Sequence, residues 1–389
     1  MPFVEASGFV PDKNAVSAQA EYSKAVDDRE GVVEGNPAQQ SSRDNYFMNK
    51  LQSERNAAKS LTPPSEEQLR KSGERMLRSP SRGVWEILKS IDASASRQIS
   101  CQLEHSARTH GLEFEHLGTT IGTVIGGVDL SSKLSSELVA VLRRTLLERK
   151  VIFFRGQTMS EEQHKDFCRH FGSLEVHPFA PPLDGHPEIL RISHGPASPG
   201  TENVWHSDVT WRVAPSMGSV LFCRQKPAFG GDTLFADAAA IYEGLGTKVQ
   251  QRLEGAVAVH DFHNFRATQL RAGVSVPVVE ELRRAFPVAK HPVVRTHPET
   301  GKKMLYVNAA FTRYIEGLPR EQSDKLLMLL YSQANCPEYQ CRFRWEEGSV
   351  AFWDNRACLH LATSDYYPQG RMMDRVTIQG DVPFYKSNL

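Results

Sequence analysis

The sequence predicts a mainly β fold with flanking helices, of the α+β kind, in which short strands build a barrel or jelly roll. After residue 172, short runs of β-branched and aromatic residues recur at wide, irregular spacing between glycines and prolines. Before that point, capping signatures and helically spaced apolar residues dominate instead. The 389 residues, 40% hydrophobic and 24% charged, have the composition of an ordinary globular chain.

The first part of the chain predicts an extension rather than a packed domain. Residues 1–60 are polar with little periodicity, so we expect them to be flexible or loosely packed. A capping box at Ser65–Gln68 predicts a helix towards Arg78, and apolar spacing over residues 84–91 predicts a second, short one. We therefore expect an N-terminal extension over residues 1–111 and a main domain over residues 112–389.

The main domain begins with short strand-like runs over residues 114–130, continues with helices and then becomes β-rich. Apolar spacing over residues 138–146 predicts a helix, the apolar run at 150–155 a buried strand, and a capping box at Ser160–Gln163 a helix to about Phe171. Further strands are predicted at residues 219–223, 233–235, 293–296, 304–307, 341–345, 349–353 and 375–379. Their spacing is typical of a barrel or jelly roll with insertions.

Composition also bears on partners and location. The 46 basic and 46 acidic residues balance, which gives no global charge for binding nucleic acid or an anionic membrane. Six scattered cysteines without a C-x-x-C pair indicate reduced thiols of an intracellular protein. We see neither a signal peptide nor a bilayer-spanning run and expect a cytoplasmic protein. The ending Ser387-Asn388-Leu389 resembles a peroxisomal address only loosely, and an ordinary tail is the favoured interpretation.

The sharpest chemical signal is a possible metal site. His206 and Asp208 are two residues apart, so in a strand both side chains would point to one face. His360 is the candidate third ligand. Two histidines and one carboxylate leave coordination positions open, as non-haem Fe(II) oxygenases require, and the lack of thiolate disfavours structural zinc. On its own the H-x-D pattern is weak, since a hydrogen-bonded pair is its commoner meaning.

Two arginines after His360 strengthen the metal interpretation. Arg371 lies eleven residues after His360 and Arg375 four further on, in an apolar β-like stretch. Buried arginines need anionic partners. A dicarboxylate such as 2-oxoglutarate would supply one, because a guanidinium binds its distal carboxylate while its keto acid end binds iron. The alternative is that both arginines form surface salt bridges.

Several motifs in a shared order resemble the taurine dioxygenase / 2,4-D dioxygenase (TauD/TfdA) family. The resemblance runs from about Leu117 to Tyr385, and its motifs lie at residues 205–210, 230–234, 291–298, 353–356 and 371–385. It implies a double-stranded β-helix (jelly roll) core and the cofactors Fe(II) and 2-oxoglutarate. It further implies a dioxygenase that uses O₂ to hydroxylate a small anionic substrate, releasing succinate and CO₂.

The resemblance also implies roles for individual residues. His206, Asp208 and His360 would be the iron ligands, and Thr233 with Arg371 would hold the distal carboxylate of 2-oxoglutarate. The anionic end of the substrate would be bound by His177, Arg375 and the backbone amide of Val209, beside an aromatic wall formed by Phe311.

This chain departs from the taurine enzymes in its pocket. Ala180 and Glu202 stand where those enzymes have a Tyr and an Asn near the substrate amine. The loss of bulk allows a larger sulfonate, a sulfate ester or a carboxylate, while Glu202 would pair with a cation or be solvated. His263 is a possible pocket wall. We interpret the remaining histidines as ordinary, with His164 and His170 on a helix surface.

Two other functions remain open at this stage. One is a tailoring oxygenase of the same family acting on a larger secondary metabolite or amino acid derivative, and the other is a non-catalytic binding protein. The complete ligand set and Arg371 argue against the second. We expect a homo-oligomer, to which the N-terminal helices would contribute contacts.

Overall fold

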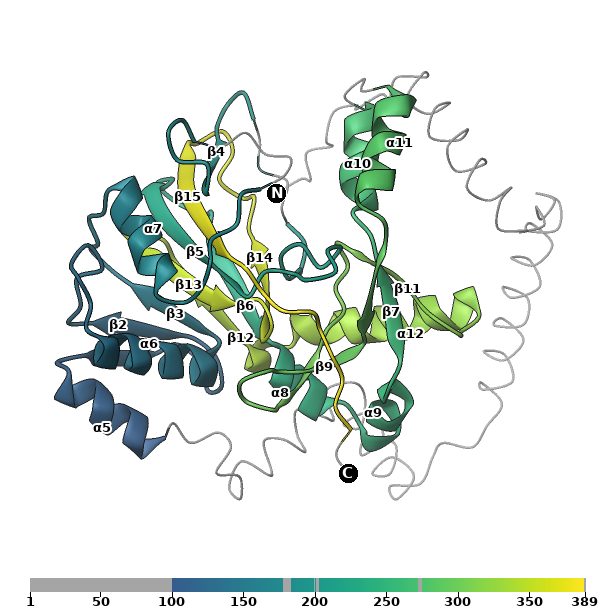
Figure 1. Cartoon of the computed structure of the whole chain (residues 1–389), viewed down its shortest axis with the longest axis horizontal. Coiled ribbons are helices and arrows are strands. Elements are labelled where there is room, and N and C mark those ends of the chain that lie inside the picture. The colour runs from purple at the N-terminus through teal and green to yellow at the C-terminus, as the bar shows by residue number, and fades with distance from the viewer. Residues whose placement is uncertain (1–99, 178–182, 199, 201–202, 272–274, 388–389) are drawn as a thin grey trace, which may run out of the picture. The chain divides into compact units, whose positions relative to one another are not determined.

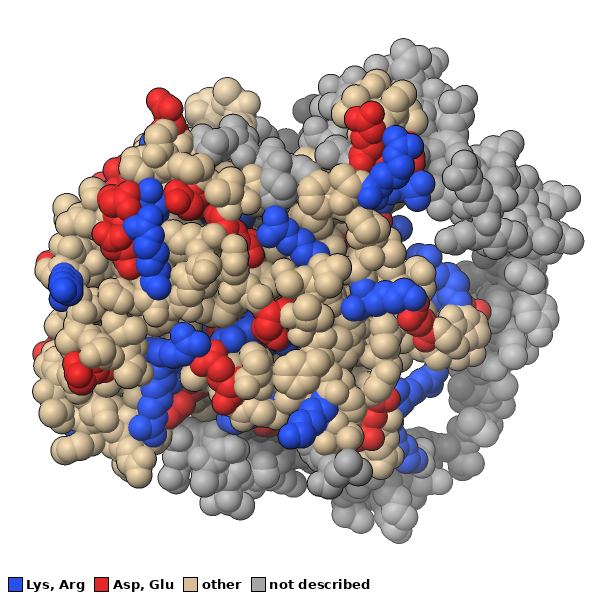
Figure 2. All heavy atoms as spheres, in the orientation of Figure 1, with Lys and Arg blue, Asp and Glu red and all other residues tan. Residues whose placement is uncertain are grey.

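The computed structural model describes residues 100–387 except 178–182, 199, 201–202 and 272–274 (Figure 1). The predicted flexible segment 1–60 and the two helices predicted between residues 65 and 91 lie outside this range. No helix within the described range is long and apolar enough to cross a membrane. Acidic and basic side chains are interspersed over the face in Figure 2, as the balanced composition leads one to expect.

A seven-stranded sheet forms the larger of two facing layers. All its neighbours pair antiparallel except β2 and β3, which are parallel. In spatial order its strands are β1 (Glu113–His116), β2 (Thr123–Gly126), β3 (Val151–Phe154), β13 (Val350–Asp354), β5 (Gly218–Gln225), β15 (Arg371–Ile378) and β4 (Ile189–His194).

A three-stranded antiparallel sheet faces the inner side of the large one. It consists of β12 (Gln340–Phe343), β6 (Thr233–Asp237) and β14 (Cys358–Ala362). Buried aromatic rings join the two sheets: Phe153 of β3 stacks on Phe343 of β12 at 4.0 Å and meets Phe235 of β6 edge-on at 5.5 Å. Burial of these large apolar side chains supplies the main stabilisation of this interface.

Helices cover the outer side of the large sheet. They are α5 (Cys101–Thr109), α6 (Ser136–Arg149) and α7 (Glu161–Arg169). Leu146 of α6 and Phe167 of α7 pack with Phe352 of β13 in one core, which also contains Leu103 of α5. The predicted capping box at Ser160 is confirmed and begins α7.

A third region continues the chain beyond β6. Two small sheets lie here, with strands β7 (Val257–His260), β8 (Ala289–Pro292), β11 (Thr312–Ile315), β9 (Val294–Thr296) and β10 (Lys303–Leu305). Its helices are α8 (Ala238–Gly244), α9 (Thr247–Leu253), α10 (His263–Arg271), α11 (Val276–Ala285), α12 (Arg320–Ser332) and the short η1 (Gln333–Asn335) and η2 (Pro337–Tyr339). A separate apolar core, which includes Leu327 of α12 and Ile315 of β11, holds this region together.

The chain thus combines helices with large β-sheets, and most predicted strands overlap observed ones. β14, which carries His360, was not predicted, because its sequence Cys-Leu-His-Leu-Ala has no β-branched residue and no alternation. The expectation that His164 lies on the surface is wrong. Its side chain is buried and meets the ring of Phe222 edge-on, since residues 164, 167 and 168 form the inward stripe of α7.

Candidate metal centre and substrate pocket

His206 and His360 are held side by side by their own backbones. The amide of His206 donates to the carbonyl of His360 at 3.0 Å, and the amide of His360 donates back at 2.7 Å. The two imidazole ring centroids lie 4.1 Å apart. An isolated β-bridge therefore pairs two residues that are distant in sequence, independently of any side-chain contact.

Asp208 completes the group. Its Oδ1 lies 3.9 Å from Nε2 of His206 and 3.8 Å from Nε2 of His360. Among the described residues, this is the one set of three His, Cys, Asp or Glu side chains whose ligand atoms all lie within 4.8 Å of one another. The expected strand over residues 206–208 is only partly present, because Asp208 begins a turn in which Val209 adopts a φ of +45°. That conformation is a genuine outlier for a β-branched residue.

The protonation states of these side chains suit a divalent cation. Nδ1 of His206 lies 2.8 Å from the carbonyl of Val204, so Nδ1 donates to that oxygen and Nε2 is the ring nitrogen directed towards Asp208. Burial, and then the proximity of His206, lower the pKa of His360 to about 3, so its imidazole is neutral. Burial alone would raise the pKa of Asp208, but the Arg375 guanidinium and the hydrogen bond from Ser219 hold it well below its usual range. Two imidazole nitrogens and a carboxylate oxygen therefore face one point, which is the donor set of a mononuclear metal site.

Asn355 orients the carboxylate of Asp208. Its Nδ2 donates to Asp208 Oδ2 at 3.2 Å, and Ser219 Oγ donates to the same oxygen at 3.0 Å. In return, Asn355 Oδ1 accepts from the amide of Asp208 at 3.2 Å and from Trp353 Nε1 at 2.9 Å. With Oδ2 engaged, Oδ1 is the oxygen left towards the histidines. Sequence reasoning missed Asn355, although its Trp-Asp-Asn-Arg motif was noted.

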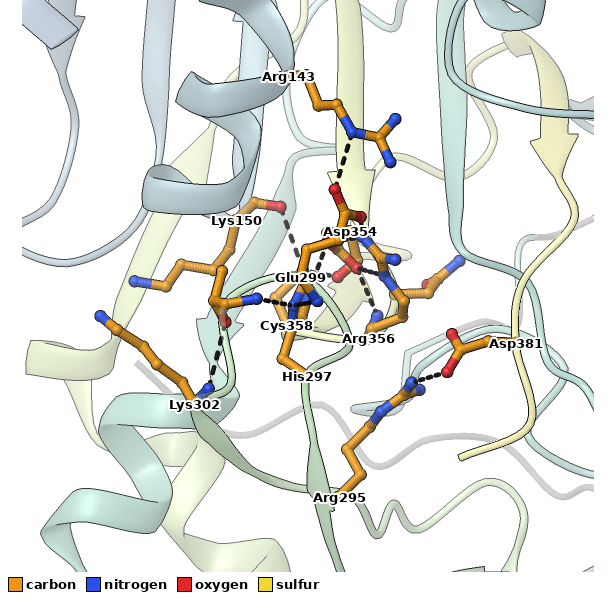
Figure 3. Close-up of polar contacts among 12 residues, drawn as sticks. Arg143, Lys150, Arg295, His297, Glu299, Lys302, Asp354, Arg356, Cys358 and Asp381 are labelled. Atoms are coloured by element: carbon orange, nitrogen blue, oxygen red, sulfur yellow. Dashed lines mark hydrogen bonds and ion pairs between the residues drawn. The ribbon is translucent and has the colours of Figure 1, made fainter. Parts of the chain in front are cut away.

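A buried ionic network anchors the turn that carries Asn355 (Figure 3). Asp354 accepts hydrogen bonds from His297 Nε2 at 3.0 Å and from Arg356 Nε and Nη2 at 2.9 and 2.8 Å. Arg356 also donates to Glu299 at 2.8 Å, and Glu299 pairs with Arg143 of α6 at 2.8 Å. Burial would raise the pKa of Asp354, yet Arg356 and His297 keep it far below its ordinary value. The turn between β13 and β14 is therefore tied to other elements on both sides of Asn355.

Thr233 and Arg371 come together around Trp345. Thr233 pairs with Ala362 and Phe235 pairs with His360, so Thr233 faces the same side of the small sheet as His360. Trp345 Nε1 donates to Thr233 Oγ1 at 3.0 Å, and the Arg371 guanidinium lies 5.9 Å from the Trp345 ring. Both Thr233 and Arg371 are buried.

Gly231 packs closely against Arg371. Its φ is +69°, and a Cβ there would come within 3.0 Å of Pro227 Cγ, 3.2 Å of Tyr366 Cδ1 and 3.3 Å of Arg371 Cδ. Its amide donates to Asp365 Oδ1 at 2.8 Å. The Gly230-Gly231 pair therefore allows the chain to turn close beside the arginine, just before Thr233.

A pocket beside Asp208 contains three of the four residues assigned to the substrate. His177, Val209 and Arg375 all line it, and Arg375 Nη1 lies 3.2 Å from Asp208 Oδ1. Burial first, and then Arg375, lower the pKa of His177 to about 4, so its ring is neutral. Phe311 is not among the lining residues, but its ring stands edge-on to that of His206 at 6.4 Å.

The remaining sequence-based assignments near the pocket have different outcomes. Ala180 and Glu202 lie outside the described residues. His260 is buried next to Thr210 Oγ1 at 3.0 Å and His291 at a ring distance of 5.1 Å, as a structural residue with no metal partner set among the residues described. His263 begins α10 and does not line the pocket beside Asp208.

A family model, curated relatives and solved structures all match this chain to the same group of dioxygenases. Residues 113–377 match the family described as "Taurine catabolism dioxygenase TauD, TfdA family". A putative alpha-ketoglutarate-dependent sulfonate dioxygenase of Schizosaccharomyces pombe is 35% identical over 284 residues, covering 70% of this chain and 71% of that protein. An alpha-ketoglutarate-dependent sulfate ester dioxygenase of Pseudomonas putida is 35% identical over 281 residues, and the match covers 70% of this chain and 92% of that protein. The crystal structure of a taurine dioxygenase from Burkholderia xenovorans is 38% identical with a TM-score of 0.60, covering 70% of this chain and 92% of that one.

Proposed function

Since this chain belongs to the TauD/TfdA family and is a 2-oxoglutarate-dependent non-haem iron dioxygenase, we propose that it hydroxylates a small anionic molecule, a sulfonate, a sulfate ester or a carboxylate. One observation supports this most strongly. The pocket that holds Arg375 and His177 opens onto Asp208, so an anion bound there would lie next to the metal centre.

We assign the metal to His206, Asp208 and His360. The β-bridge sets the spacing of the histidines, and Asn355 with Ser219 directs one carboxylate oxygen towards them. Bound Fe(II), with 2-oxoglutarate and O₂, supplies the oxidising power that hydroxylates a C–H bond and releases succinate and CO₂. The chain's own part is to hold the reactants in register and keep the site dry.

Thr233 and Arg371 are assigned to the distal carboxylate of 2-oxoglutarate. Arg371 is buried near the aromatic rings of Trp345 and Tyr366, at 5.9 Å from each, and its planar guanidinium is suited to bind a carboxylate through two hydrogen bonds. Thr233 faces the same side as His360 two residues along the paired strand. A dicarboxylate would therefore bridge the arginine and the metal centre.

Substrate binding is assigned to Arg375, His177 and the amide of Val209. The Arg375 guanidinium supplies the positive charge. Neutral His177 adds a hydrogen bond without adding a second positive charge to the pocket. The unusual backbone of Val209 turns the chain directly after Asp208, which is the kind of local strain found at functional sites. The edge of Phe311 beside His206 would limit the space next to the reacting carbon.

Further features of the proposal concern architecture. The two facing sheets, with His360 of the proposed metal centre on β14, support a jelly-roll core with insertions. A main domain starting near residue 112 agrees with β1 at Glu113, although Leu103 of α5 packs in the same core. A cytoplasmic location and a homo-oligomer stay predictions.

Succinate release tests the function. The full chain, supplied with Fe(II) and 2-oxoglutarate, should release succinate faster in the presence of at least one member of a panel of alkyl sulfonates, sulfate esters and aryloxy carboxylates. Neutral alcohols of matched chain length serve as controls. Stimulation by the alcohols but by none of the anions would contradict the substrate class and leave the dioxygenase activity intact.

A further inference from the structure

The substrate pocket contains an acidic residue that its proposed anion-binding role does not explain. Glu175 lines the pocket beside Asp208, together with Arg375, the single Lys or Arg among the lining residues. Glu188 lines the same pocket, with its carboxylate 3.5 Å from the ammonium group of Lys165. A carboxylate beside an anion site weakens anion binding. Its presence is useful only if the site has to distinguish one kind of anion from another.

Glu175 also lines a second, outer pocket, and Arg212 belongs to that pocket only. The carboxylate thus stands between the two pockets, with the guanidinium behind it. Arg212 Nη1 lies 2.8 Å from Glu175 Oε2, and Ser216 Oγ donates to the same oxygen at 3.1 Å. This pair forms the wall between the outer pocket and the pocket next to the metal centre.

The backbone holds both partners in place. The amide of Glu175 donates to the carbonyl of Thr377 at 2.9 Å, two residues beyond Arg375 on β15. The amide of Arg212 donates to the carbonyl of Val209 at 2.9 Å, so Arg212 closes the turn that follows Asp208. The ion pair therefore connects the strand of the anion-binding arginine with the turn of the metal ligand.

The Glu175 carboxyl stands in a partly buried, charged environment. Burial raises its pKa, and Arg212 and the hydrogen bond from Ser216 offset only part of that effect. Arg212 and Ser216 hold the carboxylate at the edge of the pocket that also contains Arg375, so a second negative charge on a bound ligand would meet it there.

We propose that Glu175 is a specificity-determining residue, whose carboxylate admits singly charged head groups such as sulfonates and sulfate esters and rejects doubly charged ones such as phosphate monoesters. This inference rests on the proposed anionic substrate. A sulfonate and a phosphonate have nearly the same tetrahedral shape, so the pocket has to separate them by charge. Arg375 balances one negative charge, and a second one meets Glu175.

The test compares methanesulfonate with methylphosphonate, at a pH where the phosphonate carries two charges. Binding is measured by calorimetry on the full chain loaded with Zn(II) and 2-oxoglutarate, which prevents turnover. Wild type should bind methanesulfonate more tightly. Glu175→Gln should reduce this preference by about tenfold, because one pairwise repulsion at close range is removed.

Arg212→Gln provides the opposite change. It leaves the charge of Glu175 uncompensated, so the preference for methanesulfonate should increase. A merely structural ion pair would make both variants move the preference in the same direction or not at all. Glu162→Gln is the matched control: it also removes a carboxylate paired with an arginine, at 2.6 Å, but lies on α7 and lines neither pocket. It should retain the wild-type preference.

Each outcome has a distinct meaning. An unchanged preference in Glu175→Gln, with methanesulfonate still bound, overturns the role of Glu175 and leaves the proposed function standing. Failure of methanesulfonate and of longer alkyl sulfonates to bind to wild type contradicts the proposed sulfonate class and with it this inference. Melting curves of the three variants check that each remains folded.

Discussion

The proposed metal centre and the proposed substrate pocket share Asp208 but are built in different ways. The proposed metal ligands are positioned by a backbone β-bridge and by a hydrogen-bonded asparagine on an anchored turn. The proposed substrate pocket is formed by the coil segment at His177, by the turn in which Val209 has a strained backbone, and by the ion pair between Glu175 and Arg212. Backbone pairing tolerates little change, whereas charged side chains on loops can be replaced singly. In such an arrangement the reaction and the substrate preference are set by different residues.

The largest expected effect comes from a change in the proposed metal centre, the part that backbone pairing holds in place. Asp208→Ala removes the one carboxylate of the donor set, so succinate release should fall by on the order of a thousandfold or more. Mn(II) binding measured by calorimetry should be lost as well. His170→Ala, an exposed histidine at the end of α7, is the control and should behave as wild type. Near-normal activity of Asp208→Ala would remove the basis of the comparison.

The two arginines of β15 sharpen the comparison, because they lie four residues apart yet should serve different ligands. Arg371→Ala should raise KM for 2-oxoglutarate by about 10- to 100-fold through the loss of a charged hydrogen bond, with little change for the primary substrate. Arg375→Ala should do the reverse. Steady-state kinetics with each ligand varied in turn measures this. If both variants affected 2-oxoglutarate alone, the substrate pocket would be assigned wrongly.

Asn355 tests whether orientation matters in the proposed metal centre. Asn355→Ala releases Asp208 Oδ2 and should weaken metal binding by about 10- to 100-fold, which is typical for partners that orient a metal ligand. The readout is the Mn(II) dissociation constant, with the melting temperature of the metal-free protein as a check on folding. Ser219→Ala, which removes the other donor to Oδ2, should have a smaller effect in the same direction. Wild-type metal affinity in Asn355→Ala would show that the bridge alone suffices.

Gly231→Ala should give the smallest effect. A Cβ would approach the side chains of Pro227 and Arg371 and place a non-glycine residue at φ +69°, at a cost of about 1 kcal/mol. We expect KM for 2-oxoglutarate to rise by about fivefold, which is what that free energy corresponds to. Gly246→Ala, where a Cβ meets nothing within 4 Å and φ is −60°, is the matched control. Equal kinetics of the two variants would contradict a role for Gly231 beside Arg371.

Some parts of the site could be predicted because their signal is local. The capping box at Ser160, the apolar strand at β3 and the β-like stretch that carries Arg371 and Arg375 depend on neighbours in sequence, and the structure contains each of them. Strand β14 was not predicted, and the predicted surface position of His164 was wrong. Packing against parts of the chain that are distant in sequence decides both features. Asn355 lay in a noted motif, but its partner Asp208 is far away in the chain.

The sequence by itself determined the types of donor and charge: two histidines, a carboxylate and two arginines in an order that resembles one family. It did not determine which atoms meet. The pairing of His206 with His360, the choice of the Asp208 oxygen that faces the histidines and the contact of Glu175 with Arg212 arise only when sheets and turns assemble. The physical reason is that hydrogen bonds and ion pairs act over a few ångströms in space, while the sequence records only distance along the chain.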